Sequence, residues 1–132
     1  AMQGIGLSLL AEKKYVQAID YFKILLEEYP GSPQVMRGLG LAYRLHGDLA
    51  SAQQVFEKTI SMEDRYVHGY LNLAYIYFKQ GKAAQAKEML DKALAIESDL
   101  TKLNDQPIIV ECLDKLNKTY TAVTLVKCYD LS

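Results

Sequence analysis

The chain has 132 residues, of which 50% are apolar and 23% are charged, with a formal net charge of −1. This composition is ordinary for one soluble globular domain that can bury a core. The near-neutral balance argues against a general affinity for nucleic acid or anionic lipid. No apolar run approaches the roughly 20 residues that cross a bilayer. The printed sequence does not begin with a basic segment followed by an apolar stretch, so we expect no signal peptide.

A repeat with a period of 34 residues organises most of the chain. The segment at 4–8 recurs at 38–42 and again at 72–76. Columns of small and of bulky residues align in this register: Gly6, Gly40 and Ala74; Leu9, Tyr43 and Tyr77; Ala18, Ala52 and Ala86; Phe22, Phe56 and Leu90; Leu26, Ile60 and Leu94. A constant period over several columns indicates a repeat architecture.

Each repeat predicts a helix, a tight turn and a second helix. In the second repeat, apolar residues recur at helical spacing over 35–43 and again over 52–60. Gly47 lies between these stretches and can adopt the left-handed conformation that ends a helix. The third repeat has the same pattern with a break at Gly81. The small columns predict close approach of two helices, and one such hairpin must stack on others to bury its apolar faces.

These residues resemble the tetratricopeptide repeat family. The shared features are the small residue of the first helix, the aromatic residue three positions later, the turn glycine, and the alanine and aromatic residue of the second helix. Pro30 matches the family's closing proline, whereas Lys13 replaces the turn glycine of the first repeat. The resemblance implies an all-α fold, a right-handed solenoid of stacked antiparallel helix hairpins, with units at about 1–32, 33–66 and 67–98.

Residues 99–132 leave the repeat register and are expected to form a capping segment of the same domain. Pro107 is typical of a first helical turn, and apolar residues follow it at helical spacing as far as Tyr120. Residues 119–129 contain many β-branched side chains, which weakens the prediction of a helix there. We expect helix, because a single strand would find no partner among helices, but strand stays open for this stretch.

The cysteines carry no recognisable motif. Cys112 and Cys128 do not form a metal-type or redox-type pair in the sequence. We expect them to be reduced thiols in a cytoplasmic protein, because disulfides are rare in that compartment.

No constellation of residues indicates catalysis, a cofactor or a metal. The pair Gly38 and Gly40 lacks the third glycine and the preceding strand of a nucleotide-binding loop. His46 and His68 have no cysteine or carboxylate at ligand spacing, and no nucleophile is marked by an adjacent base. The protein is therefore expected not to be an enzyme.

The resemblance also implies a binding groove formed by the first helices of the repeats. The residues expected to point into it are Gly4, Leu7, Leu10, Gln34, Arg37, Gly38, Leu41, Arg44, His68, Leu71, Asn72, Tyr75, Phe78 and Lys79. The candidate peptide-binding residues among them are Leu7, Arg37, Leu41, Arg44, His68, Asn72, Tyr75, Phe78 and Lys79. An apolar floor with basic sides predicts a partner peptide or amphipathic helix with some acidic residues. The alternative is that the chain's own C-terminal segment, or a second copy, covers the floor.

The family also includes a carboxylate clamp for C-terminal peptide tails. Arg37 and Asn72 fall on matching columns and Lys102 is a candidate third residue, but Leu41 stands where the clamp requires asparagine. The predicted function is a protein-interaction adaptor or scaffold. The alternatives are a dedicated secretion-type chaperone and the regulatory segment of a larger enzyme, and homo-oligomers are compatible with each.

Overall fold

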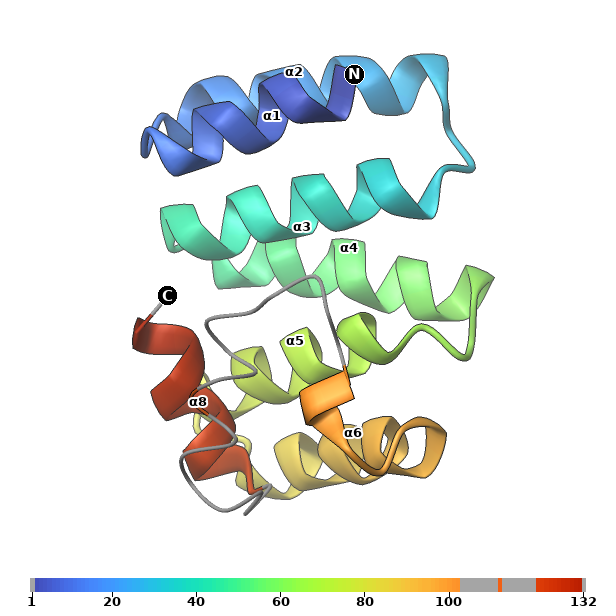
Figure 1. Cartoon of the computed structure of the whole chain (residues 1–132), viewed down its shortest axis with the longest axis vertical. Helices are drawn as coiled ribbons and strands as arrows, with labels where there is room; N and C mark the ends of the chain where they lie inside the picture. The colour runs from blue at the N-terminus through green and yellow to red at the C-terminus, as the bar shows by residue number, and fades with distance from the viewer. Residues whose placement is uncertain (1, 103–111, 113–120, 132) are drawn as a thin grey trace. The chain divides into compact units, whose positions relative to one another are not determined.

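The computed structural model describes residues 2–102, 112 and 121–131 (Figure 1). Within these ranges every regular element is helical. The elements are α1 (Met2–Ala11), α2 (Tyr15–Glu28), α3 (Pro33–His46), α4 (Leu49–Met62), α5 (Val67–Lys79), α6 (Ala83–Ile96), the short 3₁₀ helix η1 (Leu100–Lys102) and α8 (Ala122–Leu131). The all-α class is confirmed. The helix expected to start at Pro107 lies outside the described residues.

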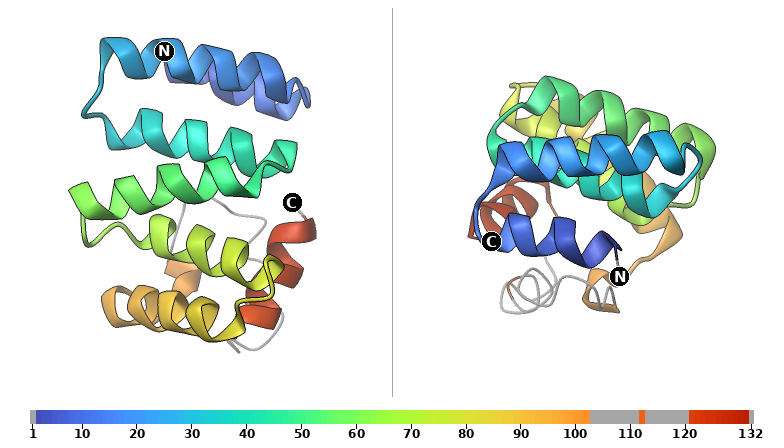
Figure 2. Two further views of the ribbon diagram at one scale, coloured as in Figure 1. Left: turned by 180° about the vertical axis from the view of Figure 1, so that it is seen from behind. Right: turned by 90° about the horizontal axis from the view of Figure 1, so that it is seen from above.

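The chain divides into two compact units. Unit 1, Ala1–Asp64, contains α1 to α4, and unit 2, Arg65–Ser132, contains the remaining helices. Figure 2 shows α1 paired with α2, α3 paired with α4, and α5 paired with α6 from two further directions. Each pair lies inside one of the three predicted repeats. That residues 99–132 share one domain with the repeats stays a prediction.

The core of unit 1 centres on the ring of Phe22, which is almost completely buried in α2. Gly6 on α1 and Gly38 on α3 both face this ring, and a side-chain carbon at either glycine would overlap it. The ring therefore lies against two helices at once, and neither helix can approach it as closely with a larger residue. The predicted close approach at Gly6 is confirmed. Gly38 was expected to point into the groove, and instead it packs against Phe22 in the core.

The second repeat uses the same arrangement within its own hairpin. A Cβ at Gly40 would lie 2.7 Å from the ring of Phe56, so glycine is required for this helix spacing. In the third repeat the corresponding residues are Ala74 and Leu90, which are buried at 0% and 3% exposure. The third repeat therefore pairs alanine, which is larger than glycine, with leucine, which is smaller than phenylalanine.

The turns between paired helices use left-handed backbone conformations. Gly47 and Gly81 have φ of 94° and 80°, as expected for glycines that end helices. Lys13 occupies the corresponding turn of the first repeat and has φ of 61°. This conformation is strained for a residue with a Cβ. The backbone at Lys13 is nevertheless left-handed, as in the other two turns, so the absence of glycine does not alter the turn.

Side-chain caps fix the starts of two helices in unit 1. Ser32 accepts a hydrogen bond from the Val35 amide at the start of α3. The Asp48 carboxylate accepts from the Ser51 amide at 3.1 Å and from the Ser51 hydroxyl at 2.7 Å at the start of α4. These hydrogen bonds from Ser51 favour the charged form and lower the pKa of Asp48 below its ordinary value.

Unit 2 is built around α5, which packs against both α6 and α8. Most of α5 is buried, including Leu73, Ala74 and Ile76 at 0% exposure. The C-terminal stretch that left helix and strand open is helical from Ala122 onward. Its β-branched residues did not prevent a helix, because α8 is stabilised by packing on α5 more than by its own propensity.

Candidate peptide-binding surface

The predicted groove residues fall on both units, with Leu7, Arg37, Leu41 and Arg44 in unit 1. Leu7 on α1 has 53% of its side-chain surface exposed, as expected for a groove residue. Leu41 occupies the equivalent position of α3 and is half-buried against the core of unit 1. Since α1 and α3 contact each other, unit 1 presents apolar residues at equivalent places on two neighbouring first helices.

The basic side predicted for unit 1 is smaller than expected. Arg44 has only 7% exposure and does not line an open groove. The same holds for the apolar residue Leu10, which belongs to the core. The prediction failed for them because both lie on faces of their helices that turn into the protein. Arg37 is half-buried.

The expected groove face of α5 is also partly internal. His68, Leu71 and Asn72 have exposures of 9%, 2% and 2%, which contradicts their predicted exposure. The Asn72 amide donates to the carbonyl of His68 at 2.7 Å, one turn earlier in the same helix. Its donor is thereby used locally, which leaves the carboxylate clamp without support at this position. The reason is the composition of α5, which is apolar or aromatic on nearly every side and is buried accordingly.

Tyr75, Phe78 and Lys79 lie at the C-terminal end of α5. Tyr75 and Phe78 are half-buried and Lys79 is exposed. Tyr75 holds the same repeat position as Leu7 and Leu41. In unit 2 this position is in contact with another helix of the chain, because α8 packs there.

A cluster of four side chains joins α5 to α8, and we call it the α5–α8 cluster: Tyr75, Lys79, Tyr129 and Asp130. The Tyr75 hydroxyl donates to the Asp130 carboxylate at 2.6 Å. The rings of Tyr75 and Tyr129 have centroids 5.6 Å apart and are tilted by 43°, a favourable geometry for aromatic pairs.

Lys79 adds a charge contact to the same cluster. Its ammonium lies 2.8 Å from the Asp130 carboxylate, with side-chain exposures of 37% and 43%. The ammonium also lies 5.7 Å from the centroid of the Tyr75 ring, within the range of a cation–π interaction. Because the Lys79–Asp130 ion pair is partly exposed, it contributes only modestly to stability on its own. Together with the Tyr75 hydroxyl it defines a site for one carboxylate.

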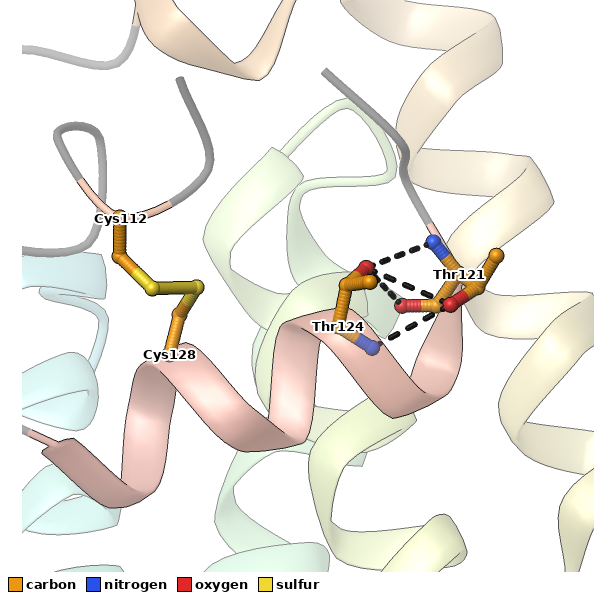
Figure 3. Close-up of a disulfide and its surroundings, with 4 residues drawn as sticks. All are labelled: Cys112, Thr121, Thr124 and Cys128. Carbon is orange, nitrogen blue, oxygen red and sulfur yellow. Dashed lines mark hydrogen bonds between the residues drawn. A yellow bond between two sulfur atoms is a disulfide. The ribbon is translucent and has the colours of Figure 1, made fainter. Parts of the chain in front are cut away.

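Two threonines define where α8 begins. The Thr121 hydroxyl accepts a hydrogen bond from the Thr124 amide, and the Thr124 hydroxyl accepts one from the Thr121 amide (Figure 3). This reciprocal pair has the logic of a capping box. Leu125, Cys128 and Tyr129 then follow on one face and are almost fully buried.

A disulfide connects Cys112 to Cys128 on α8 (Figure 3). The expectation of two reduced thiols is therefore wrong. The Cα atoms are 5.7 Å apart, within the usual range for a bridge. Their separation of 16 residues carries no recognisable motif, and the pairing depends on how the chain returns to α8.

Sequence reasoning also missed Tyr129 and Asp130. Asp130 is one acidic residue at the end of a helix that was itself uncertain, and nothing in its neighbourhood indicates a partner on α5. The Thr121–Thr124 pair was the available signal, since it predicts where a helix begins.

The surface hollow on α6 is not a candidate site. It is lined by Ala84, Ala95 and four charged residues: Lys87, Glu88, Asp91 and Lys92. Lys87 pairs with Asp91, and Lys92 with Glu88, one turn apart along the helix. Such pairs are typical of a solvated helix face. Among the described residues, no group of three or more His, Cys, Asp or Glu could hold a metal ion.

Comparison with known proteins decides the family. The tetratricopeptide repeat model matches residues 9–59 and 43–102. The chain belongs to the tetratricopeptide repeat family. Members of this family are generally non-catalytic interaction modules, and the helix hairpins of both units are of this type.

One curated relative of this tetratricopeptide repeat chain is the photosystem I assembly protein Ycf3 of Rippkaea orientalis. It is 28% identical over 94 residues, which cover 69% of this chain and 54% of the relative. The chain therefore spans about half the length of that relative.

Solved structures show the same fold at low identity. The Sgt2 repeat domain of Aspergillus fumigatus has a TM-score of 0.70 at 23% identity, covering 74% of this chain and 65% of that one. The type III secretion chaperone SycD of Yersinia enterocolitica, in complex with a peptide of the translocator YopD, has a TM-score of 0.73 at 16% identity, covering 98% and 90%. The first repeat domain of Spaghetti (RPAP3), bound to the HSP90 peptide SRMEEVD, has a TM-score of 0.72 at 18% identity, covering 88% and 90%.

These likenesses establish the α-solenoid fold class of tetratricopeptide repeats. Two of the similar structures hold a bound peptide. In the part of the chain that the structure describes, no helix combines the length and apolarity needed to cross a bilayer.

Proposed function

We propose that the protein is an adaptor that binds an apolar segment of another protein on the first helices of its repeats. The observation that carries this proposal is Leu7, a large apolar side chain that is 53% exposed on the first helix of a tetratricopeptide repeat. Leu41 holds the equivalent position of α3, is half-buried, and lies on a helix that contacts α1. Apolar side chains that adjoin across two helices are characteristic of an interaction surface.

The proposed partner segment is amphipathic and carries at least one acidic residue. In unit 1, Leu7 and Leu41 offer apolar contact, and Arg37 adds a half-buried cation. Arg44 is removed from this proposal because it is buried. An amphipathic helix in a groove is a common way for helical surfaces to bind peptides.

Leu7 and Ile24 offer a matched test. Ile24 lies on α2, the second helix of the same repeat, and is 57% exposed. A partner is captured from the source cell, and the segment of it that binds is identified and prepared as a peptide. The Kd of this peptide is then measured for each variant. Leu7→Ala is expected to weaken binding roughly five- to thirtyfold, as for an apolar anchor, whereas Ile24→Ala leaves it unchanged. Equal effects of the two substitutions would overturn the proposed surface.

A second candidate is a dedicated chaperone, and one observation favours it. The SycD structure covers 98% of this chain, so the likeness extends beyond the repeats to the described helix α8. Co-purification of a secreted substrate that is unstructured alone would support this function. A chain that binds only folded partners would exclude it.

The predicted cytoplasmic location and the capacity for homo-oligomers stay predictions. The alternative that the chain is the regulatory segment of a larger enzyme also stays a prediction.

A further inference from the structure

We propose that α8 is an internal occupant of a docking surface on the third repeat, held in place by the Cys112–Cys128 disulfide. A partner helix of the same chemistry replaces α8 after a thiol reductant has cleaved the disulfide. This inference rests on the proposed function, because it takes the first helix of a repeat as the binding element. It adds the identity of the occupant and the condition for exchange.

Leu7, Leu41 and Tyr75 share one position of the repeat. In unit 1 this position carries an exposed and a half-buried leucine. In unit 2 the same position contacts α8 through the ring of Tyr129 and the carboxylate of Asp130. The third repeat therefore already binds a helix at the place where the first repeat is open.

The chemistry of α8 indicates what kind of helix the third repeat binds. The face of α8 toward the protein consists of Leu125, Cys128 and Tyr129, which have 1%, 0% and 4% exposure. Their spacing of three and four residues is that of a helix that anchors in a groove. Asp130 follows and places its carboxylate 2.6 Å from the Tyr75 hydroxyl and 2.8 Å from the Lys79 ammonium. The predicted partner helix thus has an apolar i, i+3, i+4 face followed by an acidic residue.

The helix α8 is too short to be stable without the rest of the chain. It has 10 residues, shorter than the roughly 12–15 residues at which isolated helices become marginally stable in water. Two of its first residues, Val123 and Thr124, are β-branched and lower its helix propensity. The disulfide closes a loop of 16 residues that ends on α8 and removes conformational freedom from the undocked segment, which favours docked α8 over a partner of similar affinity.

The exchange step is chemically complete with a dithiol as the reductant. Cys112 is half-buried while Cys128 has 0% exposure, so the thiolate of the dithiol attacks the Cys112 sulfur and Cys128 leaves as a thiolate. The second thiol of the reagent then releases Cys112 and closes a cyclic disulfide. Two electrons and two protons pass to the protein, which leaves two free thiols.

The test uses the full chain and a fluorescent peptide with the sequence of residues 121–131. The peptide carries Cys128→Ser, so that it cannot form a disulfide with the protein. Anisotropy titrations compare oxidised wild type, wild type reduced with dithiothreitol, and Cys112→Ser. The reduced protein and Cys112→Ser are expected to bind at least tenfold more tightly than the oxidised protein. Equal binding by all three forms, or binding by none, would overturn the proposal.

Substitutions on α5 locate the peptide. In the Cys112→Ser background, Tyr75→Phe and Lys79→Met each remove one contact to the carboxylate while keeping most of the side-chain volume. Together they are expected to weaken peptide binding roughly five- to tenfold, and a peptide with Asp130→Asn is expected to lose a similar factor. The control is Lys92→Met on α6, which removes an exposed cation outside the cluster and leaves the affinity unchanged. An equal loss in the control would contradict docking on α5.

Amide hydrogen exchange gives a second readout on wild type, independent of any substituted chain. Protection of α8 amides is expected to fall on reduction, while protection of α1 to α4 persists. Unchanged protection of α8 would overturn the proposal even if the peptide binds elsewhere.

The proposal and the proposed function fail in different ways. A natural partner that binds oxidised and reduced protein equally, and is sensitive to Leu7→Ala, leaves the adaptor function intact and rejects the role of α8. A peptide that exchanges with α8, with no partner sensitive to Leu7→Ala, does the reverse.

Discussion

Lys13 shows how one residue can preserve a turn at an energetic disadvantage. It adopts φ of 61° where the other two repeats have Gly47 and Gly81. A left-handed conformation costs a residue with a Cβ about 1–2 kcal/mol, and a glycine would regain this at the expense of about 0.4–1 kcal/mol of unfolded-state entropy. Lys13→Gly is therefore expected to raise the free energy of unfolding by about 0.5–1 kcal/mol in urea denaturation.

Lys14 provides the control for this prediction. It is the next residue along the chain and has φ of −90°, so glycine there relieves no strain. Lys14→Gly is expected to leave the free energy of unfolding unchanged or to lower it. Stabilisation by both substitutions would mean that the gain at Lys13 has nothing to do with its backbone.

Single residues also mark the limit of the sequence analysis. Leu7 was correctly expected to be exposed, because its column was assigned to the inner face of the first helix. Arg44 and His68 were assigned to the same face and are buried. Helical periodicity gives the angle of a residue around its helix, but the neighbours that cover that angle come from the rest of the fold.

The hairpin as an element depends on a matched pair of small and bulky residues. Glycine accompanies phenylalanine at Gly40 and Phe56, whereas alanine accompanies leucine at Ala74 and Leu90. We expect Gly40→Ala to lower the free energy of unfolding by about 1 kcal/mol, because overpacking outweighs the gain in helix propensity.

A double-mutant cycle tests whether the pair acts together. Phe56→Leu alone is expected to be destabilising through lost contacts, and adding Gly40→Ala to it should restore part of that loss. The expected coupling free energy is about 1 kcal/mol or more. If the free-energy changes of the two substitutions simply add, the pairing of Ala74 with Leu90 in the third repeat is not explained by packing between them.

The start of α4 predicts a pH dependence. Hydrogen bonds from Ser51 lower the pKa of Asp48 in the folded protein, so this carboxylate adds stability above its unfolded pKa. The contribution is lost as the pH falls through the lower, folded pKa. Asp48→Asn keeps a capping oxygen that does not titrate.

The stability advantage of wild type over Asp48→Asn is therefore expected to shrink between pH 7 and pH 3 in parallel urea titrations. An advantage that is constant over this range would mean that the Asp48 carboxylate does not contribute through its charge.

Elements were more predictable than their contacts. The paired helices and their turns follow from the repeat, because its small, bulky and glycine columns each have a local structural meaning. The helix α8 was uncertain because its β-branched residues lower its helix propensity, whereas its packing on α5 comes from the rest of the fold. The alternative that the C-terminal segment covers the groove floor anticipated a contact at Tyr75, but not that Asp130 makes it, since the two residues are 55 positions apart in the chain.

At the scale of the whole molecule, the disulfide adds a covalent constraint to unit 2. Its partners are separated by 16 residues, and closing a loop of this length is worth about 3 kcal/mol in the chain-entropy account. Adding dithiothreitol to wild type is expected to lower the free energy of unfolding by about 2–3 kcal/mol. Cys112→Ser serves as the control, because it should be insensitive to the reagent. A reagent effect of equal size in that variant would assign the loss to something other than the bridge.

The ring of Phe22 has a consequence for how unit 1 comes apart. It touches Gly6 on α1 and Gly38 on α3 while belonging to α2, so three helices share one contact point. Detaching α1 would bare one side of the ring and allow it to tilt away from α3. Under a stretching force, we therefore expect these three helices to give way in one event, without a stable intermediate in which α1 alone has peeled off.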